Sequence, residues 1–163
     1  MRRRDDTAFV QFVDDRSTQL LRMAYLLSGD QHLAEELVQE TLERVYVRWS
    51  RLHQGQEMAY ARRVLTNLRT DRWRRVRREV VTDALPESAA RPHDTTADRD
   101  LLLRALGTLA GREREIVVLR YYCDQSESSV AQCLGISPGT VKSTASRALA
   151  KLRAQLDRPE VTR

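Results

Sequence analysis

The stretch from Ser126 to Leu152, SESSVAQCLGISPGTVKSTASRALAKL, constrains the fold most, because it predicts two short helices joined by a tight turn. Ser126 is a good N-cap for the first helix, and Gly135 ends it, since glycine adopts the left-handed conformation at little steric cost. Ser137 caps the second helix, and Pro138 suits its first position. The pattern predicts a helix-turn-helix, a unit that places its second helix in the major groove of DNA. An ordinary helical hairpin with a solvated face is the alternative.

The second of these helices has two unlike faces. Its apolar stripe is expected to face the core and consists of Val141, Ala145, Ala148, Leu149 and Leu152. The opposite face is small and polar, so that it can approach a groove closely. Its flanks carry basic side chains that suit phosphate. The residues predicted to contact DNA are Thr140, Lys142, Ser143, Ser146, Arg147 and Lys151.

The charge of the chain favours a nucleic-acid partner. The sequence has 28 Lys and Arg against 23 Asp and Glu, a net charge of +5 and a pI near 9.7. Residues 1–78 carry a net +5, residues 79–100 carry −4, and residues 101–163 carry +4. Two basic modules therefore flank an acidic connector. Nearly all the basic residues are arginines, which indicates a GC-rich genome.

Several classes of protein are not expected. No apolar run approaches the roughly 18 residues that cross a membrane, and the basic start lacks the apolar stretch of a signal peptide, so a cytoplasmic protein is predicted. Cys123 and Cys133 lack metal-ligand spacing, and the histidines are scattered, so neither a disulfide nor a metal site is expected. The sequence shows no glycine-rich phosphate loop and no nucleophile–base pair, so neither an enzyme nor a cofactor is expected.

Residues 5–78 are predicted to form the first helical domain. Apolar residues recur at helical spacing up to the Ser28-Gly29 break, and Asp30 caps the next helix. The first apolar set is Phe9, Val10, Phe12, Val13, Leu20, Leu21, Ala24 and Leu27. The second is Leu33, Leu37, Val38, Leu42, Val45, Tyr46 and Trp49. The other face of the second helix is mostly acidic, so it is either solvated or docks a basic partner protein; it carries Glu35, Glu36, Gln39, Glu40 and Glu43.

A loop from Ser50 to Gln56 leads to a third predicted helix, residues 57–79. Between Tyr60 and Arg78 this helix holds eight arginines and one acid, with two aromatic residues interleaved. Aromatic rings among arginines suit stacking on exposed bases beside a phosphate track. A solvated amphipathic helix is the alternative, since a core stripe is also present: Ala61, Val64, Leu65, Leu68 and Val76.

The helical pattern disappears between residues 79 and 99, where Pro86, Pro92 and many small or acidic residues predict a flexible linker. Periodicity returns at Leu101, and the second domain is predicted over residues 100–155, followed by a tail, 156–163. The fold predicted for the chain is therefore all-α: two small helical domains joined by an acidic flexible linker, the second with the helix-turn-helix.

The order of these parts resembles the sigma factors of bacterial RNA polymerase, and among them the small extracytoplasmic-function group. In the first domain the likeness rests on DQHLAEELVQET followed by Tyr60, Asn67, Asp71 and Arg74. In the second it rests on REREIVVLRYY and LGISPGTVKS with Arg147. The likeness covers essentially the whole chain. It implies three partners: core RNA polymerase, contacted at its clamp and flap, promoter DNA, and an anti-sigma factor.

The resemblance also implies roles for residues. The clamp contact would be made by Glu36, Gln39 and Glu40. The minus-10 element would be melted and held by Leu52, His53, Gln54, Gln56, Tyr60, Arg63, Asn67, Asp71 and Arg74. The minus-35 element would be read by the exposed face of the last helix, named above. Ile116, Val117, Leu119 and Tyr122 would pack the second domain and help meet the flap, and the acidic linker would lie in the RNA path. The competing class is a stand-alone helix-turn-helix regulator that binds duplex DNA by itself.

Overall fold

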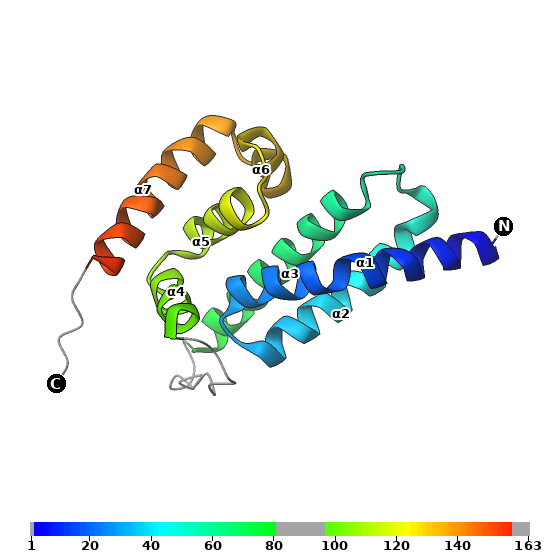
Figure 1. Ribbon diagram of the computed structural model, residues 1–163, viewed down its shortest axis with the longest axis horizontal. Coiled ribbons are helices and arrows are strands. Elements are labelled where there is room, and N and C mark those ends of the chain that lie inside the picture. The colour runs from blue at the N-terminus through cyan, green and yellow to red at the C-terminus, as the bar shows by residue number, and fades with distance from the viewer. Residues whose placement is uncertain (1, 81–96, 158–163) are drawn as a thin grey trace. The chain divides into compact units, whose positions relative to one another are not determined.

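The computed structural model describes residues 2–80 and 97–157 of the 163 residues (Figure 1). Those residues form helices and short connections without a strand, which confirms the all-α prediction. The chain divides into two compact units, Met1–Ser88 and Ala89–Arg163. Most of the predicted linker, 79–99, lies outside the described residues, as do residues 158–163 of the predicted tail. The flanking helices extend to Val80 and begin at Ala97.

The first unit consists of α1 (Arg2–Ser28), α2 (Gln31–Arg48), the 3-10 turn η1 (Trp49–Arg51) and α3 (Glu57–Val80). The three helices pack on one another, with α2 in contact with both of its neighbours. Their fully buried side chains are mostly long and aliphatic, and include Leu20, Met23, Leu27, Leu37, Val45 and Leu65. The break after α1 is as predicted: Gly29 has φ +73°, and the Asp30 carboxylate accepts a hydrogen bond from the Leu33 N–H at 2.7 Å.

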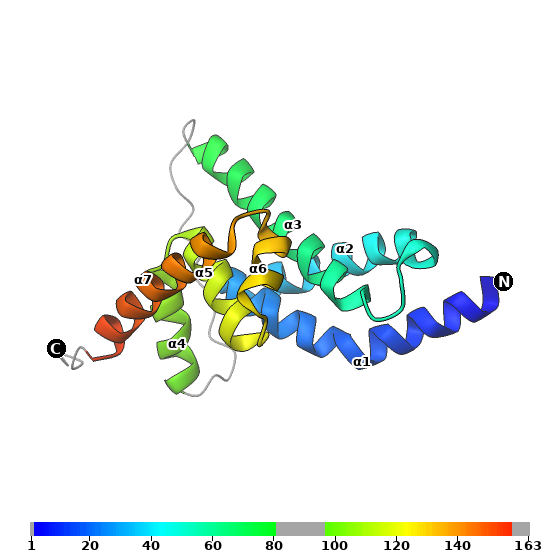
Figure 2. The ribbon, with the colours of Figure 1, turned by 90° about the horizontal axis from the view of Figure 1, so that it is seen from above.

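Three residues predicted for the apolar stripes are largely exposed. Val10 is 56% exposed, Tyr46 51% and Val76 49%. Tyr46 still contacts α1, since its hydroxyl donates to the Asp6 carboxylate at 3.0 Å and its ring centroid lies 4.9 Å from that of Phe9. The prediction for Val76 was wrong because the buried stripe of α3 ends at Leu68, and the helix then runs past α1 and α2 (Figure 2).

The second unit consists of α4 (Ala97–Gly107), α5 (Gly111–Val117), the π-helical turn η2 (Val118–Tyr122), α6 (Glu127–Leu134) and α7 (Pro138–Leu156). Helices α4, α5 and α6 all contact α7, so the last helix forms one wall of the core. Fully buried side chains at its centre are Ile116, Leu119, Val130, Val141 and Ala148. Helix α7 runs one turn beyond the predicted end at Leu152. Among the described residues, no helix is long and apolar enough to cross a membrane.

Candidate nucleic-acid interface

Helices α6 and α7 form the predicted helix-turn-helix, and each signal in the sequence has its expected geometry. The Ser126 hydroxyl accepts a hydrogen bond from the Ser129 N–H at 3.1 Å, and the Ser137 hydroxyl does the same for Thr140 at 3.1 Å. Between them Gly135 is left-handed, with φ +66°. The end of α6 is closed by the Ile136 N–H, which donates to the Ala131 carbonyl at 3.1 Å. Both helices are therefore held by local contacts.

Helix α7 presents all six predicted DNA-contacting residues to solvent: Thr140, Lys142, Ser143, Ser146, Arg147 and Lys151. The opposite stripe is buried through Val141, Ala145 and Ala148. Most of the exposed side chains are small, so the helix backbone can come close to base edges. The structure therefore brings the predicted residues together on one surface, which we call the α7 face.

Lys151 of the α7 face is already ion-paired, and Arg147 donates a hydrogen bond to the Thr144 hydroxyl at 3.4 Å. The Lys151 ammonium donates to the Glu113 carboxylate at 2.7 Å, and the other oxygen of Glu113 accepts from the Ala110 N–H at 3.0 Å. The hydrogen bond from Lys151 holds the pKa of Glu113 below its ordinary value. The pair ties the end of α7 to the start of α5. Lys151 therefore has less charge to offer a phosphate than Lys142 has.

In the first unit, the residues predicted for minus-10 contacts form a stripe on α3. Tyr60, Arg63, Asn67, Asp71 and Arg74 follow at intervals of three or four residues, which places them on one side of the helix. Tyr60 is half-buried and the other four are exposed. The buried stripe through Ala61, Leu65 and Leu68 lies on another side. We call the five residues the α3 stripe.

The loop from Leu52 to Gln56 leads into this stripe and is fastened at both ends. At its start, the Trp49 ring packs on Phe9 and Phe12, with centroids 5.2 and 5.3 Å away. At its end, the Glu57 carboxylate accepts a hydrogen bond from the Gly55 N–H at 2.8 Å, where Gly55 has φ +88°. Of the predicted loop residues, Leu52 is half-buried, and the exposed ones are His53, Gln54 and Gln56.

Sequence reasoning did not identify the two residues that hold the loop. Trp49 was assigned only to an apolar stripe, and Glu57 was assigned to a helix start and to the minus-10 region, but not to holding the loop. A carboxylate two residues after a glycine at a helix start was the available signal for Glu57. The contact of Trp49 with α1 joins residues about 40 apart in the chain, so no local pattern shows it.

Trp73, the other aromatic residue among the arginines, lies on a different side of α3 from the α3 stripe. It is 43% exposed, and the Arg77 guanidinium lies 4.8 Å from its ring centroid. One face of the ring is therefore covered by a cation within the same helix. Stacking of Trp73 on a base stays a prediction.

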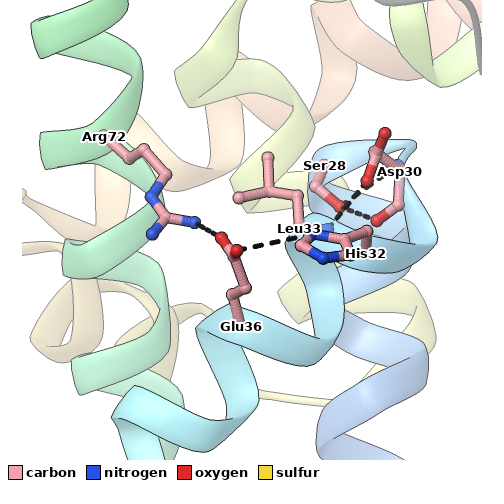
Figure 3. Close-up of polar contacts among 6 residues, drawn as sticks. All are labelled: Ser28, Asp30, His32, Leu33, Glu36 and Arg72. Atoms are coloured by element: carbon pink, nitrogen blue, oxygen red, sulfur yellow. Dashed lines mark hydrogen bonds and ion pairs between the residues drawn. The ribbon is translucent and has the colours of Figure 1, made fainter.

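The acidic face of α2 is exposed, and its side chains are linked by contacts. Glu40 pairs with Arg44 at 2.7 Å, and the Gln39 amide donates to Glu43 at 3.5 Å, both within α2. Glu36 instead reaches α3, where it pairs with Arg72 at 2.6 Å (Figure 3). Glu36, Gln39 and Glu40 lie within two turns of one helix, so one protein surface could contact all three.

Residues 2–80 and 97–157 contain no group of three or more His, Cys, Asp or Glu side chains placed to hold a metal ion. Cys123 is buried and Cys133 half-buried.

The fold and its surfaces together define the class of protein: a helical DNA-binding protein with two basic modules, a helix-turn-helix and an exposed acidic face on α2. Comparison with known families makes this specific. The pattern of sigma-70 region 2 matches residues 12–79, and that of sigma-70 region 4 matches residues 99–152. The chain belongs to the sigma-70 family of RNA polymerase sigma factors, in its extracytoplasmic-function group, whose members direct the polymerase to promoters.

Individual relatives agree with this assignment. The RNA polymerase sigma-E factor of Streptomyces coelicolor is 44% identical over 154 residues, which cover 91% of this chain and 85% of the relative. The ECF RNA polymerase sigma factor SigL of Mycobacterium tuberculosis is 32% identical, covering 92% and 89%. Among solved structures, the sigma factor RpoE from Bartonella quintana, crystallised with the anti-sigma factor NepR, has a TM-score of 0.79 at 28% identity, covering 93% of this chain and 99% of that one.

Proposed function

We propose that this sigma factor uses the α3 stripe and its loop for the minus-10 element and the α7 face for the minus-35 element. The observation that carries the proposal is the loop fastened at both ends beside an exposed stripe of arginine, asparagine and tyrosine. A stand-alone regulator has no need of such a surface in addition to a helix-turn-helix.

In this proposal the first unit only binds promoter DNA and catalyses no reaction. Extruding a base from the duplex costs a few kcal/mol, and stacking with a fitted pocket offsets that cost. Tyr60 lies beside the loop and supplies the ring, while Asn67 offers both a donor and an acceptor to an unpaired base edge. The protein would therefore need neither catalytic chemistry of its own nor a cofactor. It would act in the cytoplasm, together with RNA polymerase.

Contacts with core RNA polymerase are assigned to two surfaces. The acidic face of α2, through Glu36, Gln39 and Glu40, would bind the clamp. In the second unit Ile116, Val117 and Leu119 are buried and pack the core, whereas Tyr122 is 38% exposed. Tyr122 is therefore the residue of that group assigned to the flap. The acidic linker, mostly outside the described residues, would occupy the RNA path.

An anti-sigma factor is the proposed regulator. Support comes from Bartonella RpoE, a structural neighbour that was crystallised with an anti-sigma factor. The exposed acidic face of α2 and the exposed α7 face are the surfaces whose occlusion would silence the protein.

Run-off transcription with core RNA polymerase on a promoter library tests this function. The expected result is a set of specific transcripts that require both the protein and the core enzyme, with little binding of duplex promoter by the protein alone. Tight, specific binding of duplex DNA by the free protein, with no specific transcripts from the mixture, would establish the regulator instead.

A further inference from the structure

Glu36 is held by contacts to both of its carboxylate oxygens. One oxygen lies 2.6 Å from Nη1 of Arg72 on α3, and the other lies 3.4 Å from Nδ1 of His32, one turn earlier on α2 (Figure 3). The Glu36 and Arg72 side chains are 46% and 39% exposed, so the pair is accessible to a binding partner.

Arg72 lies in the arginine-rich helix but outside the α3 stripe. Successive residues of an α-helix are about 100° apart, which places Arg72 about 120° around the axis from Tyr60 and well away from that stripe. Figure 3 shows its guanidinium extending from α3 toward α2. An arginine turned toward α2 in this way cannot also serve the α3 stripe.

The geometry points to a different role for Arg72, and we infer that it is a positioning residue for the contact between Glu36 and core RNA polymerase. This inference rests on the proposed use of the acidic face of α2. A charge-assisted hydrogen bond from Arg72 restricts the orientation of the Glu36 carboxylate, and a side chain that is already restricted loses less conformational freedom when a partner binds. A carboxylate has about four acceptor sites, so Glu36 retains capacity for a donor of the polymerase. The surface of this protein that binds polymerase would therefore depend on residues of two helices, α2 and α3.

The decisive variant is Arg72→Gln, with Arg75→Gln as the matched control. Both remove one positive charge from the surface of α3, but it is Arg72 that pairs with Glu36. Affinity for core polymerase is measured without DNA, by fluorescence anisotropy of the labelled protein. Arg72→Gln should weaken binding by about two- to fivefold, the range of an exposed ion pair, and Arg75→Gln should leave it unchanged. Arg72→Lys, which keeps the charge but has a shorter side chain without a guanidinium group, should fall between.

A double-mutant cycle with Glu36→Gln separates positioning from a general effect of charge. If Arg72 acts through Glu36, the double variant binds polymerase no more weakly than Glu36→Gln alone. Binding of the assembled holoenzymes to a single-stranded minus-10 oligonucleotide is the second readout, and Arg72→Gln should match wild type there. Thermal unfolding of each variant checks that the fold is intact, with Arg72→Lys available if Arg72→Gln is unstable.

The outcomes distinguish the two levels of the proposal. If wild type does not bind core polymerase, the proposed function itself is wrong. If wild type binds and Glu36→Gln weakens binding, but Arg72→Gln matches its control or adds its full effect to Glu36→Gln, only the role of Arg72 is overturned. Loss of oligonucleotide binding with normal polymerase affinity would make Arg72 a DNA contact.

Discussion

The α7 face and the α3 stripe both carry polar and basic residues on an exposed helix, yet they are built differently. The α7 face belongs to a helix whose start is capped by Ser137 and whose exposed side chains are mostly small. The α3 stripe continues from a loop that is fastened by Trp49 and Glu57. A helix with small exposed side chains fits the groove of paired DNA, whereas a fixed loop beside an aromatic side chain suits bases that have left the duplex. On the proposed assignment, the two units are therefore suited to different states of the same promoter.

Electrostatics separate the two surfaces further. The end of the α7 face is neutralised by the Lys151–Glu113 pair, which leaves Lys142 and Arg147 as its main charges. The α3 stripe has two arginines, Arg63 and Arg74, against one acid, Asp71, and further arginines lie on other sides of the helix. Phosphate attraction should therefore matter more to the first unit than to the second.

The largest effect is expected from removing the α3 stripe's polar and aromatic contacts. The triple variant Tyr60→Ala, Asn67→Ala, Arg74→Ala should reduce open-complex formation by about 100-fold or more, because stacking alone is worth about 1–3 kcal/mol per base. Closed-complex affinity should change by less than about threefold. Permanganate reactivity of promoter thymines measures opening, and Arg22→Ala on α1 is the control. An equal loss of closed-complex affinity would reduce these residues to phosphate contacts.

Arg147→Ala should have the next largest effect, and it should change specificity. A bidentate arginine contact to guanine contributes about 1–3 kcal/mol of discrimination, so base preference should relax at one or two minus-35 positions. Lys142→Ala should retain the consensus and weaken all sites alike. Selection from randomised minus-35 sequences decides between them. If Arg147→Ala returns the wild-type consensus at uniformly lower affinity, Arg147 is a backbone contact.

Replacing two left-handed glycines with alanine, one at a time, compares the role of the turn in the second unit with that of the loop in the first. Gly135 and Gly55 have φ +66° and +88°, and the space that a β-carbon would take is open at both positions, so only backbone strain opposes alanine. Gly135→Ala should lower the stability of the protein by about 1–2 kcal/mol, measured by denaturant unfolding. Gly55→Ala lies in an exposed loop and should weaken minus-10 capture more than stability. If Gly135→Ala mainly weakened minus-10 capture and Gly55→Ala mainly lowered stability, the turn would not be structural and the loop would not be functional.

The smallest effect expected concerns Glu113. Its pKa is lowered by the hydrogen bond from Lys151, so the pair stabilises the fold above the ordinary carboxyl value of 4.5, and this contribution is lost as the pH falls through the lowered pKa. Glu113→Gln should therefore cost up to about 1 kcal/mol at neutral pH and nothing below the lowered pKa, where both proteins lack the charge. Thermal unfolding across this range provides the test, and a difference that persists at low pH would point to the Ala110 contact instead.

Local signals predicted the helix ends well and the long-range contacts poorly. Asp30, Ser126, Gly135 and Ser137 each fix a few neighbouring residues, so sequence alone was enough to place them. The exposure of Val76 was missed because periodicity shows which side of a helix is apolar but not where its neighbours end. Likewise, Arg72 and Glu36 are 36 residues apart, and only the packing of α2 on α3 brings them together.

The most direct test of the difference between the two units is a crossed binding measurement on the holoenzyme. Two variants, the α3-stripe triple alanine and Lys142→Ala with Arg147→Ala, are each measured on closed duplex promoter at low temperature and on a single-stranded minus-10 oligonucleotide. We expect the α3-stripe variant to lose affinity only for the oligonucleotide and the α7-face variant only for the duplex. If both variants lose affinity for the duplex equally and neither for the oligonucleotide, the two surfaces are not specialised for unpaired and paired DNA.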